Sequence, residues 1–136
     1  MTPPDGPNAG PIVRLTKRAQ FLYVRGGAKA VRETVIIEAR RRQPAEGAVG
    51  VGFTASKKVG NAVARNRSRR RLREAAKRLL PSLGLPGADY VLVARQTTPD
   101  APWARLLDDV QNALLRLAAE LEGRAAPPRR APRPKP

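Results

Sequence analysis

The segment from residue 51 to residue 80, VGFTASKKVGNAVARNRSRRRLREAAKRLL, constrains the fold most, because a short apolar strand leads directly into a strongly basic helix. Residues 57–78 contain ten Lys or Arg side chains and a single acid, Glu74. Like charges at this density repel one another unless a polyanion covers them. We therefore expect a helix that packs on a sheet with one side and binds a polyanion with the other.

The apolar residues of this helix predict which side it buries. They follow the spacing i, i+3, i+4, i+7 and so share one stripe: Leu72, Ala75, Ala76 and Leu79. A second set recurs every four residues and is expected on the opposite, solvent side: Arg65, Arg69, Arg73 and Lys77. The helix is expected to begin at about Ala62 or Arg65 and to end at Leu80, before Pro81 and Gly84.

The remaining pattern predicts a sheet covered by helices, in the order αβββαβα with about four strands. A short first helix is expected over residues 15–24, with Leu15, Ala19 and Leu22 on one stripe and Phe21 near its edge. Three of these strands are expected at 34–39, 49–55 and 90–94, the last one central, and a final amphipathic helix between about Asp100 or Pro102 and Gly123.

The strand at 49–55 has two very different faces. One face is apolar, formed by Val49, Val51, Phe53 and Ala55, and the other carries little side-chain bulk, with Gly50, Gly52 and Thr54. A smooth face leaves room for a ligand to approach the backbone. We assign Phe53 to core packing because of this alternation.

Composition indicates one domain and an anionic partner. Of the 136 residues, 1–12 are expected to form a disordered arm, 13–123 a single nucleic-acid-binding domain and 124–136 a disordered Arg/Pro-rich tail. The formal charge is +16, yet residues 79–123 are net acidic, so the basic charge is concentrated on part of the chain. Without Cys there is neither a disulfide nor a thiolate metal site, and without an apolar leader or span we expect a soluble, cytoplasmic protein.

Candidate catalytic groups are few. Asp108 and Asp109 are adjacent on a helix, where neighbouring side chains diverge, so a solvated face is favoured over a two-metal site. The chain has no His, the usual general base for RNA cleavage. The run Ser56-Lys57-Lys58 follows a strand but lacks the spacing of a phosphate-binding loop, which leaves the two lysines as phosphodiester contacts or as solvated turn residues.

Arg65-Asn66-Arg67 is the sharpest short motif. Arginine presents a planar fork of donors that matches phosphate oxygens or guanine edges. Asn66 could contact a ligand or cap the helix, and these three residues alone favour neither role.

The sequence SKKVGNAVARNRSRRRLREA at 56–75 resembles the signature of the protein subunit of bacterial ribonuclease P. Residues 14–27, 51–58 and 89–95 are similar to the first helix, third strand and last strand of that family, so the resemblance spans about 14–118. It implies a two-layer α/β sandwich, of the α+β type with a mixed sheet, in which the basic helix joins two parallel strands by a left-handed crossover, against the usual preference.

The resemblance also implies a function. The family pairs with a large catalytic RNA, the ribonuclease P RNA, and this holoenzyme is a tRNA-processing endonuclease that removes the 5′ leader from precursor tRNA. The RNA subunit carries the catalytic site and binds most of the Mg2+, with one protein expected per RNA. The alternatives are a small ribosomal or RNA-chaperone protein, or an independent endonuclease, which the residue inventory disfavours.

Site residues carry over with the motif. The implied RNA contacts are Lys57, Lys58, Arg65, Asn66, Arg67, Arg69, Arg70, Arg73 and Lys77. Phe21 matches an aromatic that lines a cleft for the single-stranded leader, where bases stack on a ring without sequence preference. Arg25 occupies the position where the family often has a second aromatic residue, and the strand at 34–39 lacks the aromatic residue often present in relatives. Leader binding is therefore expected to depend more on charge and less on stacking.

Overall fold

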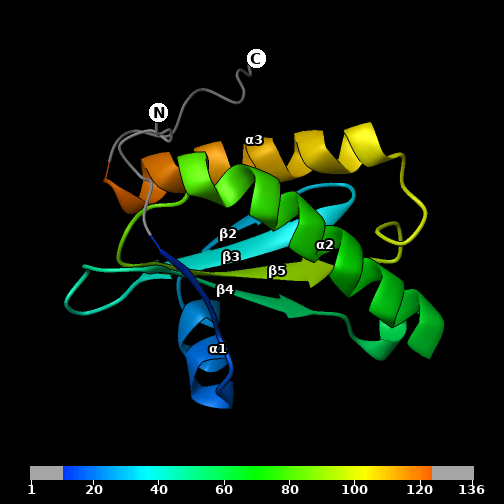
Figure 1. Cartoon of the computed structure of the whole chain (residues 1–136), viewed down its shortest axis with the longest axis horizontal. Coiled ribbons are helices and arrows are strands. Elements are labelled where there is room, and N and C mark those ends of the chain that lie inside the picture. The colour runs from blue at the N-terminus through cyan, green and yellow to red at the C-terminus, as the bar shows by residue number, and fades with distance from the viewer. Residues whose placement is uncertain (1–10, 124–136) are drawn as a thin grey trace, which may run out of the picture.

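The computed structural model describes residues 11–123, which form one five-stranded sheet and three α-helices (Figure 1). The predicted order αβββαβα is confirmed, with one additional strand at the start. The elements are β1 (Ile12–Arg14), α1 (Arg18–Arg25), β2 (Ala28–Val31), β3 (Val35–Arg41), β4 (Val49–Thr54), the short 3₁₀ helix η1 (Lys57–Val59), α2 (Ala62–Leu83), β5 (Ala88–Ala94) and α3 (Trp103–Leu121).

The sheet is mixed, with the strand order β1-β4-β5-β3-β2. As predicted, the apolar strand β5 is central, and it runs parallel to β4 and antiparallel to β3. Helix α2 connects β4 to β5 across one face of the sheet, and Figure 1 shows that this connection is left-handed. The handedness implied by the family resemblance is therefore correct.

Helices α2 and α3 cover one face of the sheet and enclose the main core. The α2 stripe predicted from periodicity is buried at Leu72, Ala75 and Ala76, and Leu80 joins it. The core also contains the inward-facing residues of three strands and the apolar face of α3: Val35, Ile37, Ala39, Val49, Val51, Tyr90, Leu92, Leu106, Val110, Ala113, Leu114 and Leu117. This packing fixes α2 against the sheet and leaves its other sides for solvent or a ligand.

Helix α2 is longer than predicted. It continues through Pro81 to Leu83, and the backbone N–H of Gly84 still donates to the carbonyl of Leu80. Proline removes its own N–H but leaves the following residues free to donate, so a helix can extend by one final turn beyond it.

Helix α1 lies on the opposite face of the sheet, so the sandwich carries a third, partial layer (Figure 1). The predicted stripe was wrong: Leu15 is buried but precedes the helix, and Ala19 and Leu22 are exposed. The helix instead packs through Val24 and Phe21 onto Val91 and Val93 of β5.

The smooth face of β4 receives this packing. A Cβ atom placed on Gly52 would lie 2.5 Å from two ring carbons of Phe21. Glycine is required here because the ring rests directly on the strand backbone. The interpretation of this face as open to a ligand is therefore wrong at Gly52, where Phe21 already covers the backbone.

The predicted terminal segments fall largely outside the described residues, namely 1–10 and 124–136. At the inner end of the expected N-terminal arm, Ile12 already belongs to β1 and aligns with Val49 of β4. No helix among the described residues is long and apolar enough to cross a membrane.

Candidate RNA-binding surface

The start of α2 is fixed by a side-chain cap. The side-chain oxygen of Asn61 accepts a hydrogen bond of 2.9 Å from the backbone N–H of Ala64, satisfying a donor that the first turn leaves unpaired. Asn66 lies inside the helix, so it is not the cap. Its side-chain oxygen accepts a hydrogen bond from Arg69, which holds that guanidinium along the helix surface.

The four basic residues spaced four apart do not form a straight stripe opposite the core. Arg65 and Arg69 are half-buried, whereas Arg73 and Lys77 are exposed. A helix turns about 100° per residue, so each step of four advances about 40° around the axis. From Arg65 to Lys77 the row therefore turns by about 120°, from beside the core stripe to the solvent, and the prediction of one exposed stripe was wrong.

One flank of α2 is bound to its own protein. Arg71 donates three hydrogen bonds to the carbonyls of Thr98, Pro99 and Ala101 in the segment between β5 and α3. Burial, with a smaller contribution from the nearby positive charge of Arg67, lowers the pKa of the Arg71 guanidinium. Arg71 is therefore a structural residue despite its position in the basic run.

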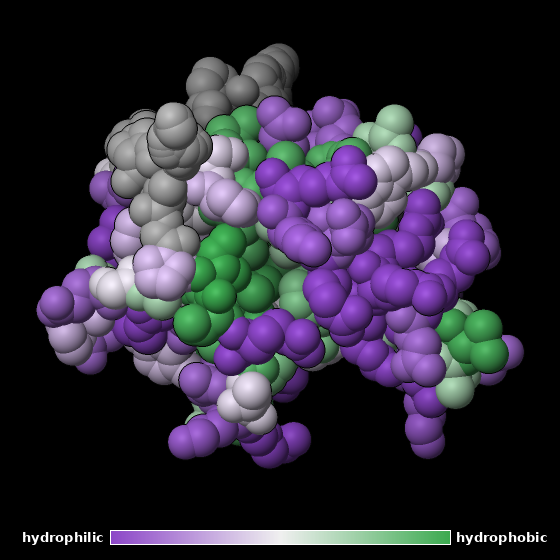
Figure 2. Space-filling view, in the orientation of Figure 1, coloured by the Kyte–Doolittle hydropathy of each residue, from purple (hydrophilic) through white to green (hydrophobic). Residues whose placement is uncertain are grey.

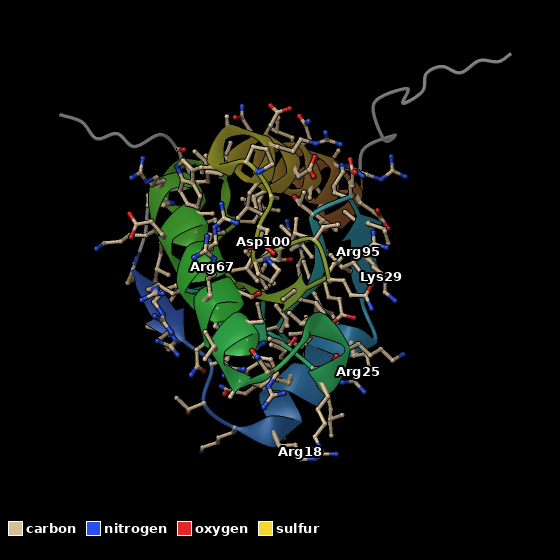
Figure 3. The ribbon with its side chains drawn as sticks, turned by 90° about the vertical axis from the view of Figure 1, so that its right-hand side faces the viewer. Arg18, Arg25, Lys29, Arg67, Arg95 and Asp100 are labelled. Atoms are coloured by element: carbon tan, nitrogen blue, oxygen red, sulfur yellow. The ribbon has the colours of Figure 1, made fainter. Side chains whose placement is uncertain are left out.

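Arg67 is shared between this structural flank and the solvent. Its Nε donates a 2.6 Å hydrogen bond to the carbonyl of Pro99, while the residue as a whole remains exposed. Figure 3 shows Arg67 on α2 facing the segment that carries Asp100. The two terminal nitrogens of its guanidinium make no hydrogen bond within residues 11–123, which leaves them for a ligand.

Five further cations of η1 and α2 are exposed and have no hydrogen-bonding partner in the described part of the chain. No side-chain hydrogen bond or ion pair occupies these exposed residues: Lys57, Lys58, Arg70, Arg73 and Lys77. Figure 2 shows hydrophilic side chains covering α2 over most of its visible length. Unpaired, exposed cations on a rigid helix form a surface suited to a phosphodiester backbone.

A cleft of about 550 Å³ opens on the other face of the sheet, between α1 and the strands. Its lining residues come from α1, β3, β4 and β5, together with the segment after β4: Arg18, Phe21, Arg25, Glu38, Phe53, Thr54, Ala55, Ser56, Val91 and Val93. The structure thus places Phe21 in a cleft beside the central sheet, as the resemblance implied. Arg18 and Arg25 project from α1 at the same side (Figure 3).

The floor of the cleft follows from strand register. One row across the sheet contains Gly52, Val91, Glu38 and Lys29, which are aligned on β4, β5, β3 and β2. The next row on this face contains Thr54, Val93, Ile36 and Val31. The Phe21 ring rests on Gly52 and forms a wall of the cleft. Val91 and Val93 form an apolar floor.

A second hollow continues the cleft toward the start of α2. It shares Ser56 and Val93 with the cleft and is lined further by Lys58 and Arg95. Lys58 of η1 therefore lies between the cleft and the exposed cations of α2. The structure brings two separately predicted features, the aromatic of α1 and the lysines after β4, onto one continuous surface.

Sequence reasoning missed two kinds of cleft residue. Phe53 packs on the core but also borders the cleft, where β1 has ended and β4 forms the edge of the sheet. Its ring lies 5.6 Å from the Arg14 guanidinium and 6.0 Å from that of Arg73. Glu38 was missed because it simply alternates with apolar residues along β3, and that pattern gives no reason to assign a function to this carboxylate.

The adjacent acids on α3 have different environments. Asp109 is buried and accepts hydrogen bonds from the backbone N–H and the hydroxyl of Thr34, at 3.1 and 2.7 Å, while Asp108 is exposed. The divergence of the two side chains is confirmed. The expected solvated face is wrong for Asp109, which joins α3 to the start of β3.

Comparison with known proteins identifies the family. A profile of the Ribonuclease P family matches residues 11–118. The chain belongs to the ribonuclease P protein family. It is 48% identical over 118 residues to the Ribonuclease P protein component of Caulobacter vibrioides, covering 87% of this chain and 79% of that one. It is 49% identical over 107 residues to the Ruegeria pomeroyi component, covering 77% and 86%.

Solved ribonuclease P proteins share the fold. The Staphylococcus aureus protein superposes with a TM-score of 0.62 at 25% identity, covering 74% of this chain and 91% of that one. The Thermotoga maritima protein, at 23% identity, has a TM-score of 0.63 with coverage of 76% and 96%. This ribonuclease P protein is thus a component of an RNA-processing ribonucleoprotein enzyme, and its fold matches that of its relatives.

Proposed function

We propose that this protein binds ribonuclease P RNA through the exposed cations of η1 and α2, and the 5′ leader of precursor tRNA through the cleft beside Phe21. Together the subunits remove the leader endonucleolytically and generate the mature 5′ end of tRNA. The observation that carries the proposal is the set of unpaired cations on a rigid helix, next to an open cleft with an aromatic wall.

Charge geometry supports contact with the structured RNA. The proposed contacts are Lys57, Lys58, Arg65, Asn66, Arg67, Arg69, Arg70, Arg73 and Lys77. Because α2 is held by its buried stripe and by the Arg71 hydrogen bonds, these side chains are presented without a large ordering cost. Arg65 and Arg69 are already held by hydrogen bonds to Gly60 and Asn66, which orients their guanidinium groups.

The cleft is suited to unpaired nucleotides. Its apolar floor and Phe21 wall offer stacking and packing to bases, while Arg18 and Arg25 at its side can neutralise phosphates. A duplex would present stacked bases and could not use such a wall. A single-stranded leader is therefore the substrate part that fits.

The chemistry of cleavage is assigned to the RNA subunit. Among residues 11–123 no three acidic, His or Cys side chains come together in a group that could hold a metal ion. We propose that the RNA binds most of the Mg2+, that the holoenzyme contains one protein per RNA, and that it acts in the cytoplasm. The protein contributes binding energy and orientation to substrate and catalytic RNA.

The test is cleavage of precursor tRNA at low Mg2+ by the protein, by a ribonuclease P RNA and by both together. Cleavage at the leader junction only by the combination is the expected result. Cleavage by the protein alone would indicate an independent nuclease. Failure of the protein to stimulate the RNA would leave a general RNA-binding protein.

A further inference from the structure

Glu38 is an anomaly in the cleft. It is a half-buried carboxylate on β3 that lines a cavity otherwise bordered by cationic, apolar and small polar groups. Its side chain makes no hydrogen bond or ion pair with any residue in the range 11–123. A carboxylate repels the phosphates of RNA, so its place in a leader-binding cleft calls for a compensating contact.

A purely structural role would use Lys29. That residue is aligned with Glu38 on the neighbouring strand β2 and shares its face of the sheet. Opposite charges directly across an antiparallel pair stabilise a sheet modestly. The two side chains do not form an ion pair, however, so the carboxylate oxygens remain available to the cleft.

The register places Glu38 at the right position to meet a base. Neighbouring strands are about 4.8 Å apart, so Glu38 lies roughly 10 Å across the sheet from Gly52, where Phe21 stands, with Val91 between them. Val91 itself is buried under α1, whereas Val93, the next residue of β5 on this face, is half-buried and lines the cleft. A base resting on Val93 beside the aromatic wall would lie diagonally across from Glu38 and within reach of its carboxylate. Single-stranded RNA is commonly read in this way, on the Watson–Crick edges of unstacked bases.

We infer that Glu38 is a specificity-determining residue that selects guanine at one position of the leader. Guanine presents two adjacent donors, N1–H and the N2 amino group, which match the two oxygens of a carboxylate. Adenine and cytosine pair one amino donor with a ring nitrogen that repels the carboxylate, and uracil places its single N–H between two carbonyls. Guanine is thus the base that both oxygens can bind at once.

This inference rests on the proposed function, because it requires the leader to occupy the cleft. The test uses the reconstituted holoenzyme and precursor tRNAs whose leader is all uridine except for one guanine, adenine or cytosine at successive positions. At one position, guanine should bind roughly tenfold more tightly than uracil, the size expected of one good bidentate contact.

The variant Glu38→Gln makes the test specific. An amide has one acceptor and one donor, a pair that the Watson–Crick edge of every base can meet, so the guanine preference at that position should be lost. Glu120→Gln is the matched control, since it removes the same charge from an exposed site on α3, on the opposite face of the sheet. Affinity for mature tRNA and the thermal unfolding midpoint verify that the variants fold.

Leader binding in the cleft and base selection by Glu38 can be refuted separately. A wild-type holoenzyme that binds precursor and mature tRNA equally would overturn the proposed use of the cleft. Leader-dependent affinity without a guanine preference at any position, or with the same preference in Glu38→Gln, would overturn the role of Glu38 alone.

Discussion

Replacing Phe21 tests the cleft most directly, because its ring both packs on the sheet and forms the proposed stacking wall. Phe21→Ala removes a half-buried ring that rests on Gly52 and packs beside Val91 and Val93. Removing a fully buried Phe costs about 3–5 kcal/mol, so the half-buried ring should contribute about 2 kcal/mol to the free energy of unfolding. Stacking of one base contributes about 1–3 kcal/mol to binding. The middle of this range, about 2 kcal/mol, corresponds to a change of about 30-fold in the affinity for precursor tRNA.

Packing and stacking can be separated by a second substitution. Phe21→Leu keeps an apolar side chain over Gly52 but removes the aromatic face, so the free energy of unfolding should change by less than about 1.5 kcal/mol. Both variants should nevertheless weaken binding of precursor tRNA by about 30-fold and leave mature tRNA unaffected. The loss in the Leu variant would then belong to stacking and not to misfolding.

The assay is the equilibrium affinity of the reconstituted holoenzyme for precursor and mature tRNA, with chemical denaturation of each free protein alongside. Equal losses for the two RNAs, or wild-type precursor affinity in Phe21→Leu, would refute the stacking wall. Either result would reduce Phe21 to a packing residue of the α1 layer.

Three further predictions address α2, β4 and the core. Substituting Arg65 and Arg67 by Ala should weaken assembly with ribonuclease P RNA and lower the slope of log K against log salt by roughly one per lost phosphate contact; an unchanged slope in a salt titration would mean that neither side chain contacts the backbone. Gly52→Ala should displace the Phe21 ring, because the new Cβ would lie 2.5 Å from it, and cost about 1–3 kcal/mol of stability together with the preference for precursor tRNA; a variant with wild-type unfolding and binding would contradict the close contact between the ring and the strand. Burial raises the pKa of Tyr90 to about 12 from 10.0, so the folded state keeps this proton to a higher pH than the unfolded state does. The free energy of unfolding should therefore fall by about 2–3 kcal/mol as the pH rises from 10 to 12. In urea unfolding, Tyr90→Phe should lose less stability than the wild type over that interval, and an equal loss in both proteins would exclude Tyr90 as the cause.

Patterns that depend on neighbours along the chain were predicted well. The stripe of Leu72, Ala75 and Ala76 and the amphipathic α3 follow from helical periodicity, since the sequence spacing alone decides which residues share a face. The same holds for the central position of β5, whose residues are apolar on both faces.

Contacts between distant segments could not be predicted in this way. Strand β1 has only three residues, all exposed, and exists because it pairs with β4. The left-handed connection through α2 came from the family resemblance, because periodicity carries no information about handedness.

By itself, the sequence determined that a basic, amphipathic helix follows a strand with one smooth face, and that a polyanion is the fitting partner. Tertiary structure decided how those residues divide their roles. It bound Arg71 to the carbonyls before α3, left Arg70 without a partner among residues 11–123, set the Phe21 ring on Gly52 and aligned Glu38 with the cleft. The physical reason is that charge and periodicity are local properties, whereas the partner of a guanidinium, a ring or a carboxylate depends on which distant backbone the fold brings beside it.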